Sequence, residues 1–126
     1  MTSYWSEEEE LLEHGDVAAA TELTLSHFVE PHVHDMVRPM QRRAYELQLA
    51  AGDPGALWPE PKPLSSLRPP TLVVLGENDR PDFAAIAERI VREAPNARLE
   101  VVAGARHLPS LERPHEFDAL VIPFLS

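Results

Sequence analysis

The sequence contains no cysteine, which excludes disulfide scaffolds, thiolate zinc sites and cysteine nucleophiles together. Aromatic residues make up only 6% of the chain, so we expect an aliphatic core. No stretch approaches the roughly 20 consecutive apolar residues that a membrane-spanning helix needs. No basic segment followed by an apolar one marks an export signal. These absences predict a globular protein of the reducing cytoplasm.

Basic residues are scarce, because 11 lysines and arginines stand against 21 acidic residues and give a net charge of -10. A chain this acidic is repelled by nucleic acid phosphates and by anionic lipid. We therefore expect neither nucleic acid nor a membrane as a partner. The 126 residues suffice for one compact domain, and a second independent domain is not expected.

The first region, residues 1–52, is predicted to be helical. A break at Gly15 is followed by Asp16, a residue type that caps helix N-termini, and a helix is expected from there to Val29. A further helix should end at Gly52, a typical C-terminal cap. Its apolar residues recur at steps of three and four and are predicted to face inward. They are Val33, Met36, Val37, Met40, Ala44, Leu47 and Ala51.

Pro39 interrupts this periodic segment and removes one backbone donor. Either a kink at Pro39 or a helix start near Arg38 is expected.

Residues 53–70 form a proline-rich linker in which a regular helix or central strand is not expected. The apolar residues Trp58, Leu64 and Leu67 are predicted to pin this linker to a larger surface. Its prolines are Pro54, Pro59, Pro61, Pro63, Pro69 and Pro70.

The third region, residues 71–126, changes its period and predicts an α/β arrangement. Thr71 to Leu75 is a continuous aliphatic run, typical of a strand buried on both faces. A helix capped by Asp82 and a second strand from Arg98 to Ala103 should follow. The two strands are then expected to be parallel and adjacent or nearly so. A final helix is expected over Pro114 to Leu125.

Two parallel strands leave exposed sheet edges with unpaired backbone groups. We therefore expect oligomerisation or a partner chain to complete the sheet.

The loops after the two predicted strands contain the candidate catalytic residues. They read Gly-Glu-Asn-Asp at 76–79 and Gly-Ala-Arg-His at 104–107. Functional residues of parallel sheets gather at the carboxyl ends of the strands, so the acid Asp79 and His107 should emerge side by side. An acid beside a histidine is half of a nucleophilic triad, in which the carboxylate fixes the imidazole.

These motifs resemble the C-terminal signature of the α/β-hydrolases. The likeness is carried by Pro70–Asp79, by Pro-Asp-Phe at 81–83 and by Gly104–Pro114, which match in order and spacing. The resemblance implies that Asp79 is the catalytic acid and His107 the catalytic histidine. It also implies that residues 1–52 correspond to the lid helices of that family and residues 71–126 to the C-terminal part of its core.

The sequence departs from that family at the nucleophile. It contains no Gly-x-Ser-x-Gly, the turn that exposes a reactive serine, and no glycine-rich loop to stabilise an oxyanion. Ser65 and Ser66 lie in the linker and Ser110 follows His107 closely, so none has the required context. We expect the nucleophile-bearing half of the fold to be absent.

Asp82 and four further histidines are predicted to have no catalytic or metal-binding role. Asp82 is expected to cap a helix rather than to act in catalysis. The His-x-His pair at 32 and 34 invites a metal hypothesis, but helical residues two apart point away from each other. Together with His14 and His27, these are predicted to be surface histidines. We expect no cofactor and no metal centre.

Two functions stay open at this point. The first is an α/β-hydrolase of ester- or acyl-hydrolysing ancestry with a Ser-His-Asp mechanism, represented by its C-terminal half and inactive alone. The second is a non-catalytic binding or assembly module derived from a truncated hydrolase. The first needs a chain that supplies the sheet and the nucleophile, and the second needs a homo-oligomer or partner without turnover.

Overall fold

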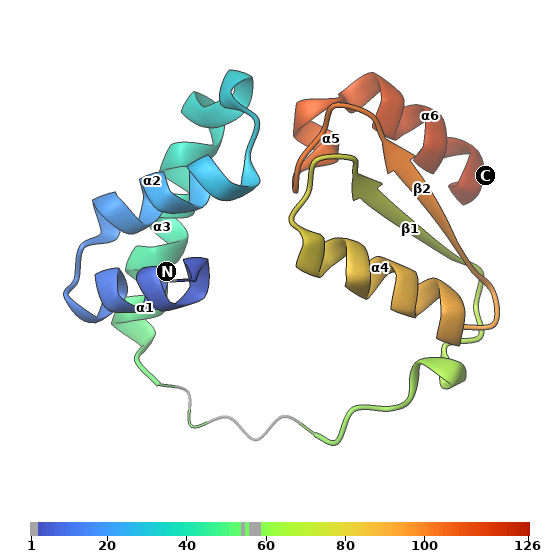
Figure 1. The fold of residues 1–126 in the computed structure, drawn as a ribbon, viewed down its shortest axis with the longest axis horizontal. Helices are drawn as coiled ribbons and strands as arrows, with labels where there is room; N and C mark the ends of the chain where they lie inside the picture. The colour runs from blue at the N-terminus through green and yellow to red at the C-terminus, as the bar shows by residue number, and fades with distance from the viewer. Residues whose placement is uncertain (1–2, 54, 56–58) are drawn as a thin grey trace. The chain divides into compact units, whose positions relative to one another are not determined.

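The computed structural model describes residues 3–53, 55 and 59–126. They divide into two compact units, Met1–Leu57 and Trp58–Ser126, shown in Figure 1. The length of the chain had predicted one domain. The difference arises because the proline-rich segment separates a helical region from a strand-containing region, and each forms its own internal contacts.

The described residues of the first unit form three helices and a short 3-10 turn. Their termini follow the predicted caps, since Asp16 accepts a hydrogen bond of 3.0 Å from the Ala19 amide and Gly52 closes the last helix. The Ser3 hydroxyl caps the first helix in the same way. The elements are α1 (Tyr4–Glu13), α2 (Val17–Phe28), η1 (Pro31–Val33) and α3 (His34–Ala51).

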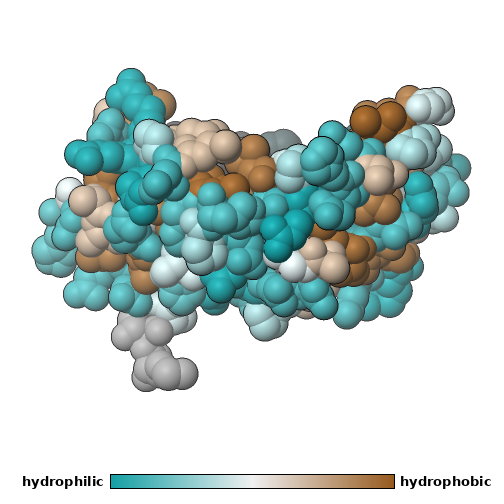
Figure 2. Space-filling view, turned by 90° about the horizontal axis from the view of Figure 1, so that it is seen from above, coloured by the Kyte–Doolittle hydropathy of each residue, from teal (hydrophilic) through white to brown (hydrophobic). Residues whose placement is uncertain are grey.

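The predicted inward face of α3 is partly wrong. Val33 and Val37 are buried as expected. Met36, Met40 and Leu47 are each more than half exposed within their unit. Within this unit, α3 packs mainly against α2, and one main helical neighbour covers only a narrow stripe of its surface. Apolar side chains accordingly reach the surface of the molecule in Figure 2, where brown areas lie among hydrophilic ones.

Pro39 lies inside α3, which begins at His34, so a helix start near Arg38 is wrong. Pro39 sits close to the N-terminus of α3 and is exposed. Its missing amide costs one intrahelical hydrogen bond there.

The second unit contains a two-stranded parallel sheet with helices beside it. Thr71 pairs with Ala97, and the register continues to Gly76 opposite Val102. The predicted α/β class and the adjacent parallel strands are thereby confirmed. The elements are η2 (Leu64–Ser66), β1 (Thr71–Gly76), α4 (Pro81–Glu93), β2 (Ala97–Val102), α5 (Pro109–Glu112) and α6 (Pro114–Leu125).

Two local predictions need correction. Asp82 does not cap α4, because the helix begins at Pro81, whose fixed φ suits the first helical position, and Arg80 occupies the cap. Thr71 to Leu75 are half-buried rather than fully buried on both faces. Within the described residues β1 pairs with β2 alone, so one side of β1 lacks a neighbouring strand.

Of the apolar residues predicted to pin the linker, the structure describes Leu64 and Leu67. Leu64 is half-buried in a single 3-10 turn and Leu67 is exposed. Trp58 and Pro54 lie outside the described residues. Among the described helices, none is long and apolar enough to cross a membrane.

Candidate active site

The site is built where the loops after β1 and β2 meet. The Glu77 amide donates to the Val102 carbonyl at 2.9 Å, and the Asn78 amide donates to the Ala105 carbonyl at 2.8 Å. A side-chain bond reinforces the contact, since the Glu77 carboxylate accepts from the Gly104 amide at 2.9 Å. Because the strands are parallel and in register, their carboxyl ends deliver both loops to one place.

Gly76 allows these two loops to approach each other. A Cβ atom on Gly76 would lie 1.8 Å from the Arg106 carbonyl oxygen and 2.6 Å from that of Ala105. Both obstacles are backbone atoms, which cannot rotate away as a side chain can. Glycine at the end of β1 is therefore what lets the segment that carries His107 cross over the strand.

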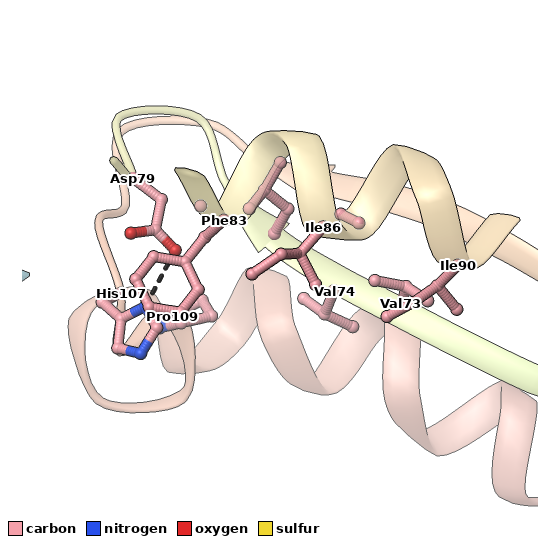
Figure 3. A pocket seen from close by; sticks show the side chains of 11 residues that line it. Val73, Val74, Asp79, Phe83, Ile86, Ile90, His107 and Pro109 are labelled. Carbon is pink, nitrogen blue, oxygen red and sulfur yellow. Dashed lines mark hydrogen bonds and ion pairs between the residues drawn. The ribbon is translucent and has the colours of Figure 1, made fainter. Parts of the chain in front are cut away.

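Asp79 and His107, the two predicted catalytic residues, are brought together as Figure 3 shows. Asp79 Oδ2 lies 2.9 Å from His107 Nδ1. The other carboxylate oxygen, Oδ1, accepts a hydrogen bond of 2.7 Å from the Arg80 amide. The Asp79 side chain is only 6% exposed. A buried carboxylate with both oxygens engaged holds a fixed orientation and can fix the ring that it binds.

His107 is more accessible than its partner, with 37% of its side chain exposed. The Phe83 ring of α4 lies against the imidazole, with centroids 4.3 Å apart and planes inclined by 50°. Because Asp79 accepts at Nδ1, the neutral ring is favoured as the Nδ1–H tautomer. Nε2 is then the nitrogen that can accept a proton, as a general base requires.

An apolar hollow of about 170 Å³ extends from this pair along β1 and α4. Val73, Ile86 and Ile90 line it, with Asp79 and His107 at one end, as Figure 3 shows. None of the described residues of β2 contributes to its wall. The hollow therefore lies beside β1 and α4.

Glu112, which the sequence did not single out, is also part of the site. Its side chain is buried, and Oε1 accepts hydrogen bonds from the Arg106 amide at 2.9 Å and the Leu108 amide at 3.0 Å. These two amides flank His107 in the chain. Glutamate is usually exposed. Glu112 lies within the Gly104–Pro114 segment that resembles the α/β-hydrolases, and that segment was the available signal, although no role was predicted for Glu112.

The remaining candidates lie elsewhere. Asp82 is exposed in the first turn of α4, and Ser65, Ser66 and Ser110 are exposed. His34 is engaged by the Val29 carbonyl, 2.8 Å from its Nε2 atom. Among the residues that the structure describes, no three histidine, aspartate or glutamate side chains gather closely enough to hold a metal ion.

Comparison with known proteins places these features in context. A profile described as "Alpha/beta hydrolase family" matches residues 4–120. Polyketide synthase ThaQ of Burkholderia thailandensis is 47% identical over 62 residues, which are 49% of this chain and 3% of that protein. Protein ABHD14A of Danio rerio is 32% identical over 66 residues, or 52% of this chain and 24% of that protein. No solved structure gives a significant match.

Proposed function

Because the chain belongs to the α/β-hydrolase family, we propose that Asp79 and His107 form the acid–histidine half of an ester- or acyl-hydrolysing site. The observation that carries the proposal is the 2.9 Å contact between His107 Nδ1 and a carboxylate that is 6% exposed. This is the arrangement that a Ser-His-Asp mechanism needs to fix the imidazole tautomer and to stabilise its charge.

In this mechanism Nε2 of His107 takes the proton of a serine hydroxyl as the serine oxygen attacks the ester carbonyl. Asp79 keeps its charge and steadies the imidazolium. The imidazolium then returns the proton to the departing alcohol, which leaves an acyl-serine. Water attacks the acyl group with His107 again as base, and the acid and the free serine are released.

The serine must come from outside the printed sequence, since no Gly-x-Ser-x-Gly occurs in it. The chain spans 3% and 24% of the length of the two relatives described above. We propose that residues 1–52 act as lid helices, that this chain is inactive alone, and that it works in the cytoplasm. The lack of cysteine supports the location.

The test uses the polypeptide that carries this sequence in its native source, purified with everything bound to it. Its hydrolysis of a short-chain p-nitrophenyl ester is compared between the wild type and a His107→Asn variant. We expect kcat/KM to fall by about 10⁶-fold, because a triad without its base retains only binding and oxyanion stabilisation.

His115→Asn is the matched control, because His115 is an exposed histidine on α6. It should keep the wild-type rate. Ester hydrolysis that is equally fast in His107→Asn, or absent from the wild-type assembly, would refute the hydrolytic function.

The second candidate is a non-catalytic assembly module that forms homo-oligomers or binds a partner chain. It is favoured by β1, which among the described residues pairs only with β2, and by the apolar hollow along β1 and α4. Covering an open strand edge pairs its backbone groups and removes apolar surface from water. This module would form a stable oligomer without turnover.

A further inference from the structure

We propose that Glu112 is a positioning residue for His107. Its carboxylate fixes the backbone on both sides of the imidazole so that Nδ1 meets Asp79. This inference rests on the proposed function, because it concerns the same acid–histidine pair. It assigns to a buried acid a role that acts through the backbone on both sides of His107.

A single oxygen makes both contacts. Glu112 Oε1 lies 2.9 Å from the Arg106 nitrogen and 3.0 Å from the Leu108 nitrogen. The residue is only 2% exposed. Hydrogen bonds from amides to a carboxylate are about twice as strong as those between neutral groups. The amides before and after His107 are therefore held at one point, which restricts the backbone that sets the direction of the ring.

The segment from Ala105 to Leu108 belongs to neither a helix nor a strand, so its amides need partners from elsewhere. The start of the segment is held by the loop after β1, because the Asn78 amide donates a hydrogen bond to the Ala105 carbonyl. Glu112, the last residue of α5, holds the part around His107. Asn78 thus holds the start of the segment, and Glu112 holds the two residues beside His107. In this proposal the position of His107 depends on the hydrogen bonds to Glu112.

Burying a carboxylate is costly, and an apolar residue would fill the same space more favourably. The two amide bonds offset that cost in part. Methionine would fill the same space but could not accept hydrogen bonds from the two amides. The orientation that Glu112 gives to the loop therefore explains why a glutamate is found here.

The test uses the full 126-residue chain, labelled with ¹⁵N and ¹³C, as wild type, Glu112→Met and Glu112→Gln. Two NMR readouts are taken. Hydrogen exchange of the Arg106 and Leu108 amides reports the two bonds, and the ring ¹⁵N shifts of His107 report its tautomer. Glu116→Met is the control, because Glu116 is an exposed glutamate on the neighbouring helix α6.

In Glu112→Met, both amides should exchange at least about tenfold faster, as loss of a bond to a charged acceptor predicts. His107 should also change from the Nδ1–H form to a mixture of tautomers. Glu112→Gln keeps an acceptor oxygen and should restore the Nδ1–H form, whereas Glu116→Met should resemble the wild type. A structural role alone would leave the tautomer unchanged.

Unchanged exchange and an unchanged tautomer in Glu112→Met would overturn the proposal. If that variant does not fold, Glu112→Asp decides, because it keeps the charge but withdraws the oxygen by one methylene. It should show both changes, and wild-type behaviour in it would overturn the proposal equally. A wild-type His107 without the Nδ1–H form would instead refute the Asp79–His107 pair, and with it the proposed function.

Discussion

Asp79 and His107 are 28 residues apart in the chain, yet their side chains lie within hydrogen-bonding distance. Their meeting follows from the register, because Gly76 stands opposite Val102 and each predicted residue lies a few positions beyond its strand. Sequence reasoning could predict this pair because the carboxyl ends of parallel strands are adjacent by construction. It could not give the distance, which depends on how the two loops fold.

Gly76 is the residue on which that approach depends. In Gly76→Ala the new Cβ would collide with the Arg106 carbonyl oxygen, 1.8 Å away, so the His107 loop must move. We expect the free energy of unfolding to fall by about 3 kcal/mol, at the upper end of overpacking costs. The ring ¹⁵N shifts of His107 should no longer show the Nδ1–H tautomer that the contact with Asp79 favours. Urea unfolding and NMR measure the two effects.

Gly15→Ala is the contrasting variant. Gly15 has a φ of 72° and nothing within 4 Å of its Cβ position, so alanine adds backbone strain without a clash. The cost should be about 1 kcal/mol with no change at His107. If Gly76→Ala were as mild and left the His107 shifts unchanged, the steric account of the loop crossing would be wrong.

Glu112 shows the limit of reasoning residue by residue. Asp79, His107 and Glu112 all lie in segments that resemble the family, but the resemblance gives roles only to Asp79 and His107. The role proposed for Glu112 rests on its hydrogen bonds to two backbone amides. Hydrogen bonds between a side chain and the backbone of a loop leave no periodic signal. Structure was needed to find it.

At the scale of elements, a partly buried polar cluster joins the three described helices of the first unit. The Tyr4 hydroxyl of α1 lies 3.0 Å from Thr24 Oγ1 of α2, which lies 2.5 Å from the Tyr45 hydroxyl of α3. Both tyrosines also donate to the Glu8 carboxylate. The cluster supplies specific contacts to helices whose amphipathic faces are narrow.

Burial raises the pKa of Tyr4 and Tyr45 above the ordinary value, and the neighbouring Glu8 raises that of Tyr45 further. They are the two tyrosines of the chain, so phenolate absorbance reports them alone. We expect little phenolate at pH values near 10, where free tyrosine is half ionised. A spectrophotometric titration of the folded chain, with the urea-unfolded chain as control, measures this.

The same shift fixes the sign of the pH dependence of stability. Both groups are neutral in the folded and unfolded chain below about pH 10, so their contribution is fully present there. As the pH rises beyond that value, the unfolded chain releases protons first and the stability is progressively lost. Half of the phenolate signal appearing near pH 10 in the folded chain would contradict the buried cluster.

Two of the predicted helix caps are confirmed, whereas Asp82 does not cap α4. Asp16 and Gly52 lie at the caps where they were expected, because capping depends on a single residue and its local backbone. The inward face of α3 was predicted only in part, since Val37 is buried as expected but Met36 and Met40 are exposed. The buried Tyr45 was not predicted. Which side of a helix is covered depends on how many neighbours it has, and spacing alone does not contain that information.

At the scale of the whole molecule, family membership and a two-stranded sheet both bear on the proposed functions. The chain matches the α/β-hydrolase family over residues 4–120, and its described strands form a sheet of two. Such a sheet is marginal unless its edges are covered. Both proposed functions require that something covers these edges. They differ in whether it also supplies a nucleophilic serine.

The apolar hollow beside β1 gives a test of association. Ile86 lines it and is 51% exposed, whereas Ile122 on α6 is 59% exposed and does not line it. If the chain self-associates through this surface, light scattering should give a mass above 14.1 kDa for the wild type. Ile86→Arg should return the mass to 14.1 kDa, because a charge cannot be buried there without a partner.

Ile122→Arg is the matched control and should associate as the wild type does. A wild-type chain that stays monomeric at every concentration would remove the homo-oligomeric form of the assembly proposal. Equal effects of the two substitutions would show that the association uses another surface.

The most direct test of the central claim is a double-mutant cycle on Asp79 and His107. It measures kcat/KM for ester hydrolysis by the native assembly with Asp79→Asn, His107→Asn and both. If the carboxylate acts only through the imidazole, the double variant is about as slow as His107→Asn alone, because the pair works as one unit. Independent, multiplying losses, or a wild-type rate in Asp79→Asn, would contradict the account.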